Sequence, residues 1–224
     1  AFAVDEVRVT GAGPRTRARL DAALDLPERP SRLTLDLAAL RRRAEATPGV
    51  AAAAVAYAPD GALVISVEER RPVALWRRAD GTLALVDGAG AVVAPVAARA
   101  DRPDLPLLLG RGAPAAAAEA VALVARAGPL ETRLRALVRV GERRWTLHLT
   151  RGQQIHLPAE GAGEALDRVL AHDAASGLLA REVAEVDLRL PGRPTLRLTT
   201  RGTAELERLR AIAATPADRE GEDI

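Results

Sequence analysis

The chain has 224 residues, which is enough for one large domain or two ordinary ones and enough to bury a core without covalent cross-links. It contains no cysteine, which excludes disulfides and thiolate chemistry. All its basic residues are arginine, and its net charge of +2 with few aromatic side chains argues against a nucleic-acid surface. No run of about 18 apolar residues occurs, so the sequence predicts no membrane span within it.

The first seventy residues carry strand and helix signals in the order β-α-α-β-β. Pro14 suits the first turn of a helix, Thr34 or Asp36 suits a helix N-cap, and Pro59-Asp60-Gly61 is a strong hairpin turn. The expected elements are a strand at Val4–Thr10, helices at Arg15–Leu24 and Leu35–Ala46, and strands at Val50–Ala58 and Ala62–Glu69.

Beyond a joint at Arg70-Arg71-Pro72, most segments alternate with the period of a strand. We expect a loop with a buried apolar patch at Asp101–Gly112, because prolines and glycines interrupt it. The other expected elements are strands at Val73–Arg77, Thr82–Asp87, Ala91–Val93, Leu134–Val140, Arg144–Thr150 and Gln153–Leu157, and helices at Ala115–Ala127 and Glu164–Ala174. The pattern predicts an α+β fold with a mostly antiparallel sheet and packed helices.

The segment EVDLRLPGRPTLRLTTRG, residues 185–202, predicts a second hairpin. Val186, Leu188 and Leu190 alternate with polar residues before the turn, and leucines alternate with polar residues over Thr195–Thr200 after it. A short amphipathic helix at Thr203–Ala213 and a polar, disordered tail follow. Because no later strand is expected, one edge of Thr195–Thr200 should stay open.

Catalytic and cofactor motifs are weak. Gly11-Ala12-Gly13 follows a strand as a dinucleotide-binding turn would, but Thr16 stands where the third glycine should be, so we interpret it as an ordinary turn. The few histidines and serines lack the spacing of a metal motif or a nucleophile elbow: His148, His156, His172, Ser31, Ser66 and Ser176. We therefore expect no enzymatic activity, no metal and no cofactor.

The ordered set of short motifs resembles a known family. The first block resembles a POTRA domain, through Val7–Gly11, Pro48–Val50 and Val64–Ala74. From about Val4 to Thr200 the chain resembles the periplasmic region of FtsQ/DivIB, a bacterial cell-division family. The motifs of the second part are Pro72–Trp76, Leu85–Gly90, Leu105–Gly110, Arg143–Leu147 and Val186–Arg189.

The resemblance implies a POTRA domain at residues 1–71, an FtsQ-type β domain at 72–202, and a helix with a tail at 203–224. It implies a non-catalytic scaffold of the divisome, held in the inner membrane by one upstream span, lying in the periplasm at the division septum. The implied partners are the single-pass coiled-coil proteins FtsB and FtsL, with a strand of FtsB added to the last strand of the second domain.

Transferred position by position, the resemblance implies one partner-binding set: Arg189, Leu190, Thr195, Leu196, Arg197, Leu198, Thr199, Thr200 and, more weakly, Arg144. Leu190 stands where family members often carry an aromatic residue, so main-chain hydrogen bonds should contribute more to this interface. The alternative functions are a POTRA-type periplasmic chaperone or secretion module that binds extended clients, and a nucleotide-binding enzyme at the Gly11–Gly13 turn.

Overall fold

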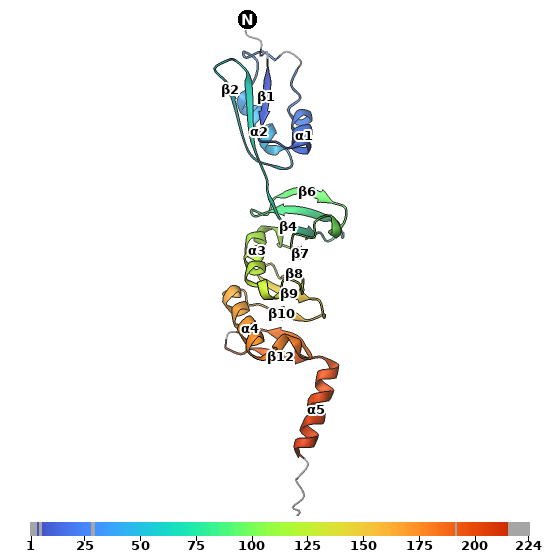
Figure 1. The fold of residues 1–224 in the computed structure, drawn as a ribbon. Helices are drawn as coiled ribbons and strands as arrows, with labels where there is room; N and C mark the ends of the chain where they lie inside the picture. The colour runs from blue at the N-terminus through green and yellow to red at the C-terminus, as the bar shows by residue number, and fades with distance from the viewer. Residues whose placement is uncertain (1–3, 5, 28–29, 191, 215–224) are drawn as a thin grey trace, which may run out of the picture. The chain divides into compact units, whose positions relative to one another are not determined.

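The computed structural model describes residues 4, 6–27, 30–190 and 192–214, and these fall into two compact units (Figure 1). The first unit comprises the described residues of 1–108 and 112–118, and the second comprises those of 109–111 and 119–224. The boundaries expected at residues 71 and 202 stay predictions.

The first unit begins with a three-stranded sheet in the order β1-β3-β2. Strand β1 runs parallel to β3, and β2 is antiparallel to β3. The elements are β1 (Val7–Thr10), α1 (Pro14–Leu24), α2 (Leu37–Ala46), β2 (Val50–Tyr57) and β3 (Leu63–Glu69). The expected β-α-α-β-β order is therefore confirmed, with a first strand that is shorter than predicted.

Local signals explain where these helices begin. Pro14 is the first residue of α1, where its missing N–H costs nothing. Asp36 is the N-cap of α2, and its carboxylate accepts the Ala39 N–H at 2.9 Å. Both helices pack their leucines on the sheet, so that Leu20, Leu24, Leu40, Leu63 and Ile65 form one core with their neighbours.

The first unit continues with strands in the order β7-β4-β5-β6. These are β4 (Pro72–Arg77), β5 (Leu83–Asp87), β6 (Val92–Val96) and β7 (Leu107–Leu109), whose last residue belongs to the second unit. The loop expected at Asp101–Gly112 is wrong in its middle, because Leu107–Leu109 is a strand. The buried apolar patch expected there is confirmed, since Leu108 is fully buried. The Pro106 carbonyl accepts the Leu75 N–H at 2.9 Å, which aligns the segment with β4.

The second unit has strands in the order β12-β11-β10-β9-β8. Strands β8, β9 and β10 form an antiparallel meander, but β10 and β11 are parallel, with α4 in the crossover between them. The elements are α3 (Ala117–Arg126, from residue 119 in this unit), β8 (Leu134–Val140), β9 (Arg144–Leu149), β10 (Gln154–His156), α4 (Ala162–Ser176), β11 (Val183–Asp187), β12 (Thr195–Leu198) and α5 (Thr200–Ala214). Short 3-10 turns at Arg99–Asp101, Pro114–Ala116, Gly128–Leu130 and Leu178–Ala180 complete the two units.

One buried layer holds the second unit together. Trp145, Leu147 and Ile155 are fully buried on the strands, and Leu166 and Val169 of α4 are buried with them. The predicted α+β class, with a mostly antiparallel sheet and packed helices, is confirmed. In the described part of the chain, each helix is too short or too polar to cross a bilayer.

Candidate functional site

Strand β12 lies at the end of the sheet of the second unit (Figure 1). It pairs with β11 in antiparallel register, with Asp187 opposite Thr195 and Glu185 opposite Arg197. Among the described residues no strand pairs with its other side. An edge of this kind presents backbone N–H and C=O groups that another strand can use.

The hydrogen bonds show which backbone groups of β12 face outward. The Thr199 N–H donates to the Glu182 carbonyl at 2.9 Å, so residue 199 is directed toward β11. Because directions alternate along a strand, residues 197 and 195 also face β11, while Leu196 and Leu198 face away. Pro194 comes next on the outward side and has no N–H, so the open edge offers the groups of two residues.

The end of the predicted strand differs from the expectation. Strand β12 ends at Leu198, and Thr200 is the first residue of α5, so the expectation of strand through residue 200 is wrong. Thr199 is the reason, because its hydroxyl accepts the Gly202 N–H at 3.1 Å and its carbonyl accepts the Thr203 N–H at 2.9 Å. These bonds are those of a helix N-cap.

Arg189 and Leu190 lie in the connection after β11, which ends at Asp187 and not at Leu190 as expected. The Arg189 N–H and Nε both donate to the Asp187 carboxylate at 2.9 Å, and they bend the chain out of the strand. The side-chain hydrogen bond from Arg189 lowers the pKa of Asp187. Leu190 is 64% exposed, so its apolar side chain is available for contact.

Arg197 points away from the core face and is held by a carboxylate. Its guanidinium pairs with Glu185 on β11, and this hydrogen bond lowers the pKa of Glu185. His156 on β10 lies on the same face, with its Nε2 3.7 Å from Glu185 and its Nδ1 3.1 Å from the Thr146 hydroxyl. The edge strand therefore carries a positive charge tied into a polar row across the sheet.

Arg144 is not next to the edge strand. It is the first residue of β9 and pairs with Val140 of β8, so β10 and β11 both lie between it and β12. By register it shares the sheet face of Arg197. The structure therefore brings Thr195–Leu198 together as one surface and leaves Arg144 apart from it.

An apolar cavity of about 280 Å³ opens beside β12 on the face covered by α4. It is apolar because Val169 of α4, Val186 of β11, Leu196 of β12, and Leu178 and Leu188 outside these elements contribute to its wall. The cavity has these lining residues: Arg168, Val169, His172, Ser176, Leu178, Val186, Leu188, Pro194 and Leu196. Leu196 is 51% exposed and thus connects the open edge with the cavity.

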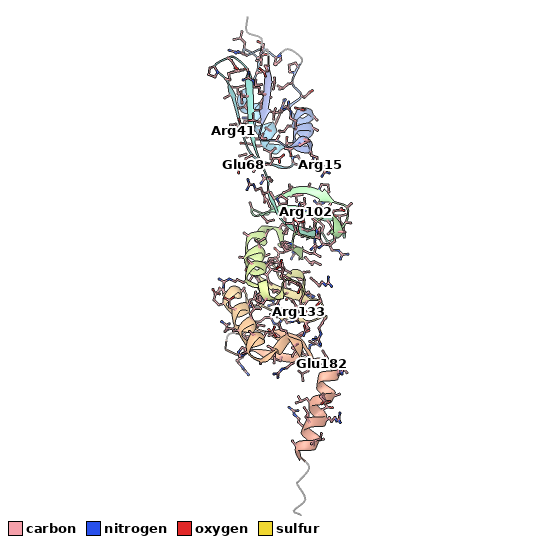
Figure 2. The ribbon with its side chains drawn as sticks, viewed as in Figure 1. Arg15, Arg41, Glu68, Arg102, Arg133 and Glu182 are labelled. Atoms are coloured by element: carbon pink, nitrogen blue, oxygen red, sulfur yellow. The ribbon has the colours of Figure 1, made fainter. Side chains whose placement is uncertain are left out.

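Sequence reasoning missed Gln153, which supports β11 from beneath. The side chain is buried, and its Nε2 donates to the carbonyls of Leu179 at 3.0 Å and Val183 at 2.9 Å. Its Oε1 accepts from Arg133, the arginine labelled in Figure 2, at 2.6 Å. Nothing in the sequence pattern marks this residue, because a glutamine beside a turn is ordinarily a surface residue.

A carboxylate of the same chain, that of Glu69, binds the backbone of the Gly11–Gly13 turn. The Gly13 N–H donates to Glu69 Oε1 at 2.8 Å, and the pKa of Glu69 is lowered by the Thr16 hydroxyl and then by this N–H. Gly11 has φ +79°, and a Cβ there would lie 2.0 Å from the Val67 carbonyl oxygen. These facts favour a structural turn, because a phosphate would meet a negative charge.

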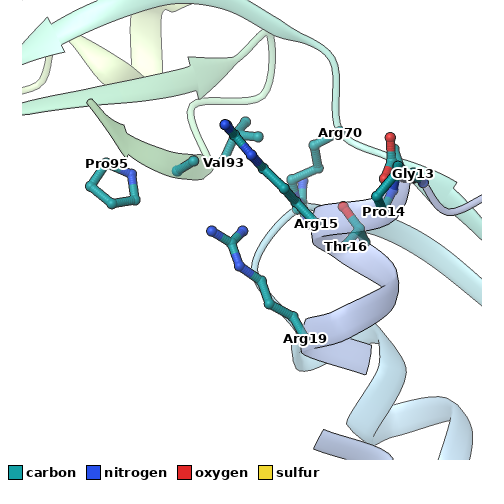
Figure 3. Close-up of a pocket in the computed structure, with 11 residues that line it drawn as sticks. Gly13, Pro14, Arg15, Thr16, Arg19, Arg70, Val93 and Pro95 are labelled. Carbon is teal, nitrogen blue, oxygen red and sulfur yellow. Dashed lines mark hydrogen bonds between the residues drawn. The ribbon is translucent and has the colours of Figure 1, made fainter. Parts of the chain in front are cut away.

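A cavity of about 490 Å³ in the first unit adjoins this turn (Figure 3). Arg15 and Arg19 extend from α1 toward Val93 and Pro95 of β6 in that view. Arg19 donates to the Pro48 carbonyl at 3.3 Å, and Arg70 pairs with Asp87 at 2.7 Å. No group of three or more metal-ligating side chains forms among the described residues.

Comparisons with known proteins agree on one family. The family model described as cell division protein FtsQ/DivIB, C-terminal, matches residues 74–189. Cell division protein FtsQ of Roseobacter litoralis is 48% identical over 204 residues, covering 90% of this chain and 69% of the relative. The same-named protein of Cereibacter sphaeroides is 42% identical, covering 97% of this chain and 70% of the relative.

The chain thus spans about two thirds of the length of these relatives. Among solved structures, the major extracytoplasmic domain of the cell division protein DivIB from Geobacillus stearothermophilus is 18% identical. The structural match covers 50% of this chain and 97% of that structure, with a TM-score of 0.34.

Both the family model and the relatives carry the cell-division description. The model matches residues 74–189, and each of these relatives aligns with at least 90% of the chain. Strand β12 and helix α5 lie beyond the residues that the family model matches. The chain belongs to the FtsQ/DivIB family of cell division proteins, non-catalytic scaffolds that act at the division septum.

Proposed function

We propose that this chain recruits FtsB- and FtsL-type single-pass division proteins by accepting one strand at the outer edge of β12. The observation that carries the proposal is the outward direction of the Leu196 and Leu198 backbone groups, beside a strand that has no second neighbour among the described residues. Strand addition uses such groups for affinity and uses alternate side chains for selectivity.

The short edge sets a limit on what main-chain bonding contributes. Two outward residues offer two N–H and two C=O groups, and net hydrogen bonds of about 0.5–1.5 kcal/mol each give about 2–6 kcal/mol. A complex with a dissociation constant of 1 μM needs about 8 kcal/mol. Side-chain contacts must therefore supply a substantial part of the affinity.

The cavity beside Leu196 is suited to supply it. Side chains of an added strand alternate between the two sheet faces, so every second one would lie over the side covered by α4. The apolar side chains that line the cavity there include Val169, Val186, Leu188 and Leu196. An apolar side chain of the partner strand, buried at this point, is the anchor that the geometry favours.

The opposite face favours an acidic residue in the partner. Arg197 is largely exposed and already pairs with Glu185, so a partner carboxylate would share its guanidinium. Exposed ion pairs contribute about 0–1 kcal/mol, so this contact sets register and selectivity more than affinity.

One pair of variants tests the strand-addition site. Leu196→Pro removes an outward N–H while keeping the bonds to β11, whereas Leu196→Ala removes the same side chain but keeps the N–H. We expect the proline variant to bind the periplasmic segment of an FtsB-type partner about tenfold more weakly than the alanine variant, a difference of one hydrogen bond. Isothermal titration calorimetry measures both, with circular dichroism as the folding control.

Arg197→Pro is the matched inward variant. Its N–H faces β11, so this change should lower the stability of the sheet itself. Equal affinities for the Leu196→Pro and Leu196→Ala variants, both folded, would exclude the edge as the binding site.

We also propose that the full protein is a single-pass inner-membrane protein with this region in the periplasm, which family membership supports. Protease treatment of spheroplasts that carry the tagged full-length protein tests this orientation. Cleavage within residues 1–224 is expected, and protection of these residues in intact spheroplasts would contradict it.

A further inference from the structure

Helix α5 carries an apolar seam along one face. Gly202, Leu206, Leu209 and Ala213 are spaced by four, three and four residues, which is the spacing of positions d, a, d and a in a heptad. Leu206 is 37% exposed and Leu209 is 54% exposed, and Ile212 beside the seam is 62% exposed. Most of this face is therefore uncovered within the described structure.

The first residue of the seam is packed against the sheet, and the later ones extend beyond the sheet. Gly202 is buried, and a Cβ there would lie 2.6 Å from the Glu182 carbonyl oxygen and 3.4 Å from the Leu198 side chain. The same face of the helix that contacts Glu182 and Leu198 at Gly202 thus presents Leu206 and Leu209 to solvent further along. A coiled-coil seam of this kind buries its leucines only against another helix.

The charged residues beside the seam are complementary between two copies of the helix. With Leu206 at position a, Glu205 occupies position g and Arg210 occupies the following position e. In a parallel pair of identical helices, position g of one helix faces the next position e of the other. Glu205 of each copy would then meet Arg210 of the other copy, twice in the symmetric pair.

We propose that α5 pairs in parallel with α5 of a second copy of this chain through Leu206, Leu209 and Ala213. Glu205 has one weak contact within its own helix, 3.9 Å to Arg208 on an exposed surface, which does not compete strongly with an interhelical pair. The helix has 15 residues, so the pairing is weak in dilute solution and strengthened when the two copies are held close together.

Single cysteines test the pairing, since the chain has no cysteine of its own. In a parallel pair, position a meets position a of the other helix, so Leu206→Cys should form an intermolecular disulfide under mild oxidation. Arg208→Cys, on the outer side of the helix, is the matched control and should cross-link at least tenfold more slowly. Non-reducing electrophoresis measures both rates.

Charge reversal distinguishes a second copy from any other occupant. In the Leu206→Cys background, Glu205→Arg or Arg210→Glu alone places like charges opposite each other in both interhelical contacts, and each should reduce cross-linking roughly tenfold. The double reversal Glu205→Arg with Arg210→Glu restores both pairs and should restore the rate. Leu196→Pro at the proposed strand site should leave the rate unchanged.

Three results would overturn the proposal. One is Leu206→Cys cross-linking no faster than Arg208→Cys. The second is a double reversal that stays as slow as the single ones, and the third is cross-linking that requires an added FtsB-type segment. Either of the last two would assign this face to a different partner.

Discussion

Asp87 is held by several donors at once. Arg70 donates to its Oδ2 at 2.7 Å, and the N–H groups of Ala89 and Ala91 donate to its Oδ1 at 3.0 and 2.8 Å. Burial of this carboxylate by itself raises its pKa, but the hydrogen bonds from Arg70 and Ala91 outweigh burial, so that the pKa is lowered. The side chain thus ties the end of β5 to the chain that leaves β3.

We expect Asp87→Asn to lower the free energy of unfolding by about 1–3 kcal/mol, because Arg70 loses a charged and buried acceptor. A carboxyl whose folded pKa is lowered contributes stability above its unfolded pKa of about 3.9, and that stability is lost as the pH falls through the folded value. The difference between variant and wild type should therefore shrink below about pH 4. Urea unfolding at several pH values measures it.

Asp80→Asn is the matched control for this prediction. The Asp80 carboxylate also accepts a hydrogen bond from a backbone N–H two residues on, that of Thr82. Asp80 is exposed, however, and has no ion pair as buried as that of Asp87 with Arg70. Its replacement should change stability less than that of Asp87. An equal loss for both variants at neutral pH would contradict the role of the Arg70 pair.

At the scale of elements, Gly202 decides how α5 meets the sheet. A helical glycine ordinarily costs about 1 kcal/mol relative to alanine, so replacing it should stabilise the helix. Here the Cβ would lie 2.6 Å from the Glu182 carbonyl oxygen, which is backbone and cannot move aside. The steric clash of an alanine Cβ with this oxygen should therefore cost more free energy than the gain in helix propensity.

We expect Gly202→Ala to displace the first turn of α5 and to speed amide exchange at Thr199, whose N–H bonds to Glu182. Gly163→Ala in α4 is the control, because its Cβ would meet only the flexible end of Arg126. Hydrogen exchange followed by mass spectrometry reads both variants. Faster exchange at Thr199 in neither variant, or in both, would show that Gly202 does not anchor the helix.

At the scale of the whole molecule, one hydrophobic core is complete within the first 67 residues. Its buried members run from Val4 to Val67, and its partly buried members also lie within this range. A segment with its own core can fold by itself. This observation supports the predicted boundary at residue 71 by an argument independent of the family resemblance.

We expect a fragment of residues 1–71 and one of residues 72–224 each to fold alone, with circular dichroism spectra that sum to that of the intact chain. The second fragment should keep the affinity of the intact chain for the FtsB-type segment, because β12 and its cavity belong to the second unit. An unfolded first fragment, or a large loss of affinity in the second, would contradict this division.

The sequence by itself determined the classes and order of most elements and the hairpins, because turn residues and alternation are local properties. It also carried the family, through short motifs in a fixed order that the comparisons confirm. The expected non-catalytic role follows from that membership.

Only the tertiary structure decided the rest, since it depends on contacts between distant residues. The strand at Leu107–Leu109 has no alternation of its own and is aligned by β4. Gln153 acquires its role only where carbonyls of Leu179 and Val183 converge on it. The outward direction of Leu196 and Leu198 on β12 follows from the pairing with β11 and from the bond between Thr199 and Glu182, which no local pattern encodes.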